Sequence, residues 1–285
     1  MVFNQQAFAI ALQEVGEQLS PEVKSPKIGT FQGMPLHIFE TLPSTNQTLW
    51  ELVDRGAPEG TAVMAAQQTA GRGQWGRQWQ STLGGLYLSL ALAPNLQVSH
   101  SAQLTLCSAW GIAIALRSYG IPVLLKWPND LLLQERKLGG ILTETRVHQG
   151  QINKAVVGVG INWSNDVPES GITLQSFCKE QLNPVINSLE RLAAIVIQGL
   201  LSGYQCWLEK GINILLPSYL ELLDSKGHPV TVDGNPGIVT GVTPSGELRV
   251  RTNFLTEAAV APISAPASAT EIYLKPGTIS LGYRR

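Results

Sequence analysis

The sequence predicts an α+β protein: a mixed or mostly antiparallel sheet covered by a few long helices, followed by a small β-rich segment at the C-terminal end. Two stretches carry apolar residues at helical spacing, and the texture after Ser225 changes to short β pieces between Gly- and Pro-containing turns. Between the two helices, strand-like stretches follow one another with only turns between them, at 123–127, 131–133, 141–145 and 155–161. Connections this short join antiparallel neighbours, because parallel strands need a long crossover.

The earlier elements can be placed in order. Apolar residues at helical spacing predict a helix from Gln5 to Leu19, which Ser20 and Pro21 end. Ser44 or Thr45 can cap a helix that runs through Leu52. Strands are expected at 36–39, 61–66 and 86–92, the last one alternating, and the long helices start near Ser99 or Ser101 and near Ser188. We therefore expect a helix and linker over 1–35, a main domain over 36–224 and a separate β domain, expected to be a barrel, over 225–285.

Composition excludes several classes of protein. The chain has 285 residues, and a hydrophobic fraction of 44% excludes wholesale disorder. Lysine and arginine number 20 against 21 aspartates and glutamates, so there is no strong basic field to hold a nucleic acid non-specifically. The N-terminal stretch lacks the basic region and cleavage site of a signal peptide, and no apolar run reaches the ~18 residues of a membrane span. We expect a cytoplasmic protein that does not enter membranes.

Cysteine and histidine do not form a recognisable metal or redox site. The cysteines lie far apart as Cys107, Cys178 and Cys206, without a CxxC pair, so neither a disulfide framework nor a zinc knuckle is predicted. The four histidines lie in separate segments without metal-ligand spacing. No metal held by histidine or cysteine is expected.

A glycine-rich loop is the first candidate functional segment. Gly71-Arg72-Gly73-Gln74-Trp75-Gly76 satisfies the GxGxxG pattern of dinucleotide-binding folds and follows a predicted strand. A dinucleotide site also requires that the loop open a helix, whereas here the chain runs from Arg77 and Trp79 into Gly84-Gly85 and another strand. The dinucleotide interpretation therefore fails, and no GxxxxGK[ST] motif of a P-loop occurs. What remains is either a solvated glycine-rich hairpin or a loop whose arginines and backbone N–H groups bind phosphate.

The second candidate is the hairpin that contains Lys126-Trp127-Pro128-Asn129-Asp130 and, after a short strand, Lys137-Leu138-Gly139-Gly140. Pro and Asn-Asp favour a turn, so the pattern places Asp130 at the rim and Lys137 on the partner strand. A lysine beside two glycines can touch a ligand closely, although a surface ion pair on an ordinary hairpin explains the pattern too. Gly158-Val159-Gly160-Ile161-Asn162 ends a buried strand, a pattern that by itself more often reflects packing than binding.

In this order and spacing, Ser44-Thr45-Asn46, Gln68 with Gly71-Arg72-Gly73, the Lys126–Asp130 block, the Lys137–Ile141 block and Gly158–Asn162 closely resemble the motifs of biotin protein ligases. The resemblance covers about 41–163. It implies a catalytic domain like that of class II synthetases, and an SH3-like C-terminal barrel. It also implies two reactions: biotin and ATP give biotinyl-5′-adenylate, and a lysine of the biotin carboxyl carrier protein of acetyl-CoA carboxylase then takes up the biotinyl group.

The resemblance assigns roles residue by residue. Lys137, Arg72 and Asp130 are the implied catalytic residues. The implied biotin-binding residues are Ser44, Thr45, Asn46, Gln68, Arg72, Gly73, Gln74, Lys137, Gly139 and Gly140. The implied nucleotide-binding residues are Arg72, Arg77, Trp79, Lys126, Asn129, Lys137 and Asn162. ATP and Mg²⁺ are the implied cofactors, biotin is the substrate, and a homodimer is possible.

One residue departs from the family pattern. The loop usually reads Gly-Arg-Gly-Arg, whereas this chain has Gln74, which removes a cation near the adenylate. Two alternatives remain open, a lipoate-protein ligase and a biotin-dependent DNA-binding regulator. The first forty residues offer one helix and only Lys24 and Lys27 as cations, so we expect no helix-turn-helix domain and no DNA binding.

Overall fold

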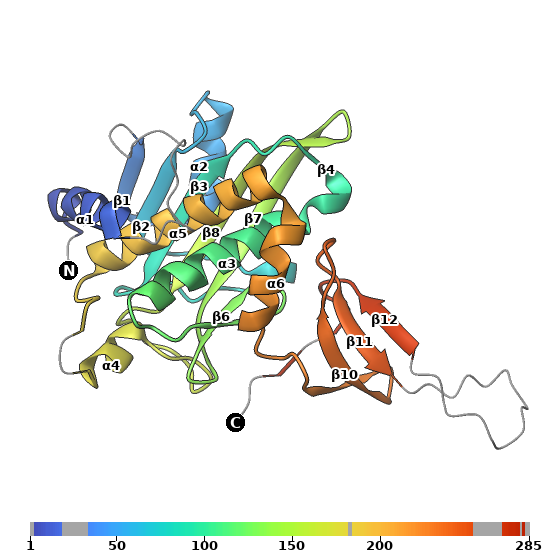
Figure 1. The fold of residues 1–285 in the computed structure, drawn as a ribbon. Coiled ribbons are helices and arrows are strands. Elements are labelled where there is room, and N and C mark those ends of the chain that lie inside the picture. Colours follow the sequence, from blue (N-terminus) through green and yellow to red (C-terminus); the bar gives the residue numbers. More distant parts are fainter. Residues whose placement is uncertain (1–2, 19–33, 182–183, 253–269, 280, 283–285) are drawn as a thin grey trace, which may run out of the picture.

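The computed structural model describes residues 3–18, 34–181, 184–252, 270–279 and 281–282. Two sheets organise this part of the chain, one large and mixed, the other small and antiparallel (Figure 1). The predicted α+β class with a mixed sheet is therefore confirmed. No helix among the described residues is both long enough and apolar enough to cross a membrane.

The large sheet has the strand order β1-β2-β3-β8-β7-β6-β5, and β4 pairs with β8 beside this path. Only β1 and β2 run parallel, and the other neighbours are antiparallel. The strands are β1 (Leu36–Leu42), β2 (Ala62–Gln68), β3 (Leu86–Leu92), β4 (Leu96–Gln97), β5 (Leu124–Lys126), β6 (Asp130–Leu133), β7 (Arg136–His148) and β8 (Gln151–Ile161). The hairpins β5–β6 and β6–β7 place the ends of three strands beside one another, and the turn residues Pro128-Asn129-Asp130 predicted the first of them.

Helices cover both faces of the large sheet. On one face the main core packs α3 (Ala102–Ser118) and α5 (Leu189–Lys210) against strand residues such as Ala62 and Met64. On the other face α2 (Thr45–Asp54) packs on the alternate residues Val63 and Ala65. Because both faces are covered, all seven residues of β3 are buried, and the expected alternation of half-buried and exposed residues there was wrong.

The two long helices approach each other at glycine residues. A Cβ atom on Gly111 would lie 2.1 Å from the backbone oxygen of Gly199, and one on Gly203 would lie 2.2 Å from the oxygen of Cys107. Helix α1 (Gln5–Gln18) then packs on α5, with Asn4 N donating to Glu190 at 2.9 Å and Arg191 paired with Glu14 at 2.8 Å. The N-terminal helix therefore shares the core of the large sheet.

Two helices were not predicted. Helix α6 (Ile212–Leu222) contains Pro217, which signals a helix break, yet its buried Leu215 and Tyr219 hold it against α3 and α5. The short helix α4 (Leu174–Lys179) is capped by Thr173, whose side chain accepts from Ser176 N. Here tertiary packing outweighs local propensity.

The small sheet has the order β12-β11-β10-β9 and begins after α6. Its strands are β9 (Pro229–Val232), β10 (Asn235–Val242), β11 (Leu248–Thr252) and β12 (Thr270–Leu274). Asp233 and Gly234 both have positive φ, which suits the tight β9–β10 turn. The described strands form an open sheet rather than the expected closed barrel. Trp127 donates to the oxygen of Gly246 at 2.9 Å, so the small sheet docks directly on the β5–β6 hairpin.

Candidate functional site

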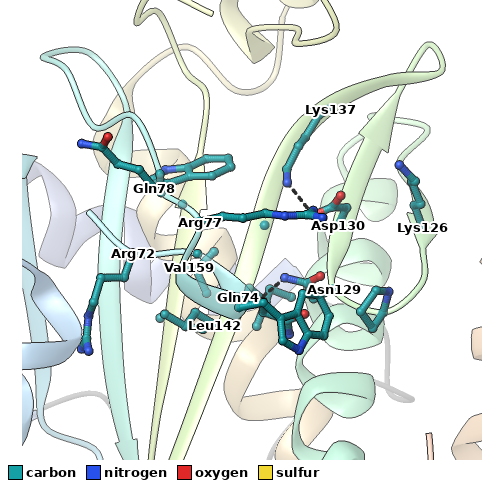
Figure 2. A pocket seen from close by; sticks show the side chains of 18 of the residues that line it. Arg72, Gln74, Arg77, Gln78, Lys126, Asn129, Asp130, Lys137, Leu142 and Val159 are labelled. Atoms are coloured by element: carbon teal, nitrogen blue, oxygen red, sulfur yellow. Dashed lines mark hydrogen bonds and ion pairs between the residues drawn. The ribbon is translucent and has the colours of Figure 1, made fainter. Parts of the chain in front are cut away.

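A cavity of about 420 Å³ lies where the glycine-rich loop, the start of α2, the β5–β7 hairpins and the C-terminal end of β8 meet (Figure 2). Most of the side chains that the sequence singled out line it. Those lining the cavity are Ser44, Thr45, Asn46, Gln68, Arg72, Gly73, Gln74, Arg77, Trp79, Lys126, Asn129, Asp130, Lys137 and Gly140. These residues come from segments far apart in the chain, which the fold brings together into one site.

The glycine-rich loop folds back on itself without opening a helix. After β2 it contains only a three-residue 3₁₀ turn at Gln74–Gly76, and Arg72 pairs with Gln78 across the loop. A Cβ on Gly71 would lie 2.4 Å from the oxygen of Trp79, so a larger residue there would open the loop. The exclusion of a dinucleotide-binding turn is confirmed.

Polar side chains at the start of α2 form a connected network on one wall. The Thr45 N–H donates to Gln68 Oε1 at 2.8 Å, and Gln68 Nε2 donates to Ser81 Oγ at 2.7 Å. The Ser89 hydroxyl lies 2.6 Å from Asn46 Oδ1 and 2.8 Å from Thr45 Oγ1. Ser44 occupies the N-cap position, but its side chain makes no capping bond. The helix start is held by side chains from β2 and β3, which leaves it rigid at the cavity wall.

Two glycines of β8 make room for site residues. A Cβ on Gly158 would lie 2.2 Å from Asn46 Oδ1, and one on Gly160 would lie 2.3 Å from Trp79 Nε1. By itself this pattern indicates packing more often than binding, and neither glycine is among the site residues that the resemblance implies. The signal was present in their spacing, because two glycines separated by one residue lie on the same face of a strand.

The β6–β7 hairpin presents an ion pair to the cavity. Lys137 Nζ lies 2.7 Å from Asp130 Oδ1, and the same ammonium lies 5.2 Å from the ring centroid of Trp79. Asp130 pairs in register with Gly140, where a Cβ would be 3.4 Å from the carboxylate. The glycine leaves the pair accessible from the cavity.

Positive charge is concentrated at this end of the site. Burial, together with the nearby cations Lys137 and Arg77, lowers the pKa of Lys126 to about 8 against the opposing effect of Asp130. Figure 2 shows Arg77 extending toward the Asp130–Lys137 pair. Such an arrangement favours binding of a polyanion, because an anion offsets the mutual repulsion of the cations.

Three of the predicted site residues use their polar side-chain groups for contacts within the protein. The Arg72 guanidinium points away from the Asp130–Lys137 pair and is bonded to Glu144 at 3.1 Å (Figure 2). Asn129 lines the cavity, but its amide donates to the oxygen of Ile141 at 2.7 Å and closes the turn. Asn162 is buried and donates to the oxygen of Lys137 at 3.2 Å.

Gly139 and Asn162 are not among the residues that line the cavity. Conversely, the segment after β12 does line it, through Gly277, Thr278, Ile279, Leu281 and Gly282. A Cβ on Gly277, whose φ is +93°, would lie 2.8 Å from the Trp75 indole of the glycine-rich loop. No local pattern in the sequence indicated this contact, because it depends on how the small sheet is docked.

Comparison with known proteins places these features in a family context. Residues 38–162, which include every lining residue before the C-terminal segment, match the model of the biotin/lipoate A/B protein ligase family. The chain is 31% identical over 261 residues to the bifunctional ligase/repressor BirA of Bacillus subtilis, covering 85% of this chain and 77% of that protein. It is 32% identical over 229 residues to BirA of Escherichia coli K12, covering 78% of this chain and 70% of that protein.

A solved structure agrees. The biotin protein ligase from Aquifex aeolicus in complex with biotin and ATP matches with a TM-score of 0.63 and 26% identity, over 85% of this chain and 100% of that one. The similarity therefore covers more of the chain than the motif-bearing segment.

Proposed function

The chain belongs to the biotin/lipoate A/B protein ligase family, and from this we propose that its cavity forms biotinyl-5′-adenylate from biotin and ATP and passes the biotinyl group to a lysine of a carrier protein. It is a biotin protein ligase, an ATP-dependent, AMP-forming enzyme. The carrier is a biotin carboxyl carrier domain, as the name of a relative from Paracoccus denitrificans, biotin–[acetyl-CoA-carboxylase] ligase, suggests. The observation that carries the proposal is the single cavity that joins a rigid polar wall to a cluster of cations.

The polar wall at the start of α2 is the proposed site for the ureido ring of biotin. The ring needs both donors and acceptors, and Thr45, Asn46 and Gln68 supply them from positions fixed by mutual hydrogen bonds. Ser44 and the backbone at Gly73 and Gln74 complete the biotin end. Fixed donors recognise a ring without the entropic cost of ordering them during binding.

The cationic end is the proposed site for the triphosphate. A biotin carboxylate oxygen must attack the α-phosphorus while the bond to pyrophosphate breaks, and negative charge accumulates at the phosphate oxygens. Lys137, Lys126 and Arg77 are placed to offset it. Trp79 offers its ring to adenine, and its buried Nε1 has no partner among the described residues. Asp130 is the carboxylate of this cluster, so Mg²⁺ would be held mainly by the phosphates themselves.

Transfer requires an uncharged amine. A carrier lysine arrives protonated, since its ordinary pKa is about 10.4. We assign Asp130 to receive and orient this ammonium and to accept its proton, while Lys137 stabilises the departing AMP. The amine nitrogen then attacks the acyl carbon, and the bond from that carbon to the phosphate oxygen breaks. The 2.7 Å contact between Asp130 and Lys137 supports a shared role in both steps.

The small sheet is proposed to be an SH3-like domain, from about Ser225 onward, that helps close the site. Trp127 anchors it to the β5–β6 hairpin, and the segment at 277–282 forms part of the cavity wall. Ahead of β1, the described helix α1 packs on α5. Cations and anions are nearly balanced in the chain, at 20 against 21, so we propose catalysis without specific DNA binding. A biotin-dependent, sequence-selective mobility shift of promoter DNA would contradict this.

Biotin-dependent exchange between ATP and labelled pyrophosphate tests the first reaction directly. Wild-type protein should exchange with biotin, whereas exchange driven by lipoate alone would favour lipoate ligation. Lys137→Ala should lower exchange by about a hundredfold or more, as expected when a charge-stabilising group is lost. Arg136→Ala is the matched control, since Arg136 is the adjacent exposed cation on β7 and should leave exchange unchanged. Equal exchange by both variants would refute the role of Lys137.

A further inference from the structure

Glu144 on β7 links three segments of the site although it does not itself line the cavity. Its Oε2 accepts hydrogen bonds from Asn46 Nδ2 at 2.9 Å, from Arg72 at 3.1 Å and from Trp50 Nε1 at 3.3 Å. Leu142, two residues earlier on the same strand face, does line the cavity. Glu144 therefore lies just behind the wall, in contact with α2 and with the glycine-rich loop.

The contact with Asn46 determines how the polar wall is held. Asn46 Oδ1 is bonded to Ser89, and Asn46 Nδ2 has Glu144 as its shorter partner and the Leu142 oxygen as its longer one, at 3.3 Å. A bond to a carboxylate is stronger than one to a neutral carbonyl. Glu144 therefore sets which way the Asn46 amide faces, with its oxygen toward Gly158 and its nitrogen toward β7.

The contact with Arg72 ties the glycine-rich loop to the same carboxylate. Arg72 is the loop cation that points away from the Asp130–Lys137 pair (Figure 2), and its ion pair with Glu144 joins residues 72 positions apart. The remainder of the loop makes backbone contacts mainly with itself, at Gly73 N to Arg77 O and Trp79 N to Gly71 O. The ion pair therefore connects the start of the loop to strand β7 through side chains.

We infer that Glu144 is a positioning residue that couples the glycine-rich loop to the Asn46 wall, and that Arg72 acts through Glu144 rather than on phosphate. This rests on the proposed function, because it concerns how the biotin end of that site is held. Loss of the carboxylate should loosen both the biotin contact and the loop that covers it. Lys126, Asp130 and Lys137 lie on the β5–β6 and β6–β7 hairpins, whose strand pairing does not depend on Glu144. ATP binding should therefore be affected less than biotin binding.

The test is a double-mutant cycle with steady-state kinetics. Glu144→Ala should raise the KM for biotin by about tenfold, as for a lost charge-assisted bond, and raise the KM for ATP by at most about threefold. It should also speed the release of biotinyl-adenylate, seen as biotinylation of bystander proteins. Arg72→Ala should reproduce the release but not the full change in KM. The double variant should be no worse than Glu144→Ala, because both changes break one linkage.

A conservative variant and a matched control separate positioning from general stability. Glu144→Gln keeps an acceptor for Asn46 and loses the ion pair, so it should restore the biotin KM but not retention of the adenylate. Asp54→Ala removes the ion pair of Arg146 with Asp54, which joins the same two elements, β7 and α2, away from the loop. It should leave both KM values unchanged.

Two results would overturn the inference. One is additive effects of the Arg72 and Glu144 changes, and the other is a biotin KM in Glu144→Ala equal to that of Asp54→Ala. Should Glu144→Ala fail to fold, Glu144→Gln and Arg72→Ala carry the same comparison. Wild-type protein without biotin-dependent exchange would instead refute the proposed function, so the two failures are distinguishable.

Discussion

Lys126 should cost the folded protein stability, and its replacement by methionine should raise the free energy of unfolding. Lys126 is buried, and burial together with neighbouring cations lowers its pKa from 10.5 to about 8. Holding the ammonium in this place costs about 3 kcal/mol relative to the unfolded chain, because each pKa unit corresponds to about 1.4 kcal/mol. Methionine keeps the apolar stem and removes the charge, so Lys126→Met should be more stable by about 1 to 3 kcal/mol at pH 7.

The shifted pKa of Lys126 also determines how the free energy of unfolding changes with pH. Below pH 8 the lysine is protonated in both states, and the full cost is present. Between about pH 8 and 10.5 the unfolded chain binds more protons than the folded one, so wild-type stability rises with pH through Lys126. The advantage of the methionine variant should therefore shrink across that window.

The assay is urea unfolding of wild type, Lys126→Met and the exposed-lysine control Lys154→Met, at several values from pH 6.5 to 10. Subtracting the wild-type value at each pH removes contributions from other titrating groups. Added ATP should stabilise wild type more than Lys126→Met, because the triphosphate restores favourable surroundings for the ammonium. A variant that is no more stable than wild type at pH 7, or a difference that does not change with pH, would refute the reasoning.

Three glycine substitutions test other parts of the structure. Gly158→Ala places a methyl group 2.2 Å from Asn46 Oδ1, so the KM for biotin should rise at least tenfold while circular dichroism shows an intact fold. Gly111→Ala forces α3 against the backbone of α5 and should cost about 1 to 3 kcal/mol in urea unfolding; an unchanged midpoint would contradict the packing. Gly277→Val strains a residue at φ +93° and meets the Trp75 indole, so it should release the C-terminal segment from the loop and slow transfer to the carrier; transfer at the wild-type rate would show that this contact is dispensable.

Much of the site was readable from the sequence because its residues lie at turns and strand ends with distinct local chemistry. Lys126, Asp130 and Lys137 come together through two tight hairpins, and hairpin register follows from turn residues and spacing. The dinucleotide interpretation of the GxGxxG loop could also be excluded from nearby sequence alone, because no helix follows the loop. Strands and long helices could be predicted for the same reason, because runs of apolar residues between turn and capping residues mark where an element begins and ends.

What only the tertiary structure decided concerns partners far apart in the chain. The ion pair of Arg72 with Glu144, the turn of Asn162 toward the Lys137 backbone, and the return of the 277–282 segment to the cavity have no local signature. Burial on both faces of β3 erased the expected alternation. The sequence by itself determined which local elements form and which chemistry each carries. Which side chains meet depends on sheet register and helix docking, because those are fixed by the packing of the whole core and not by any single stretch of chain.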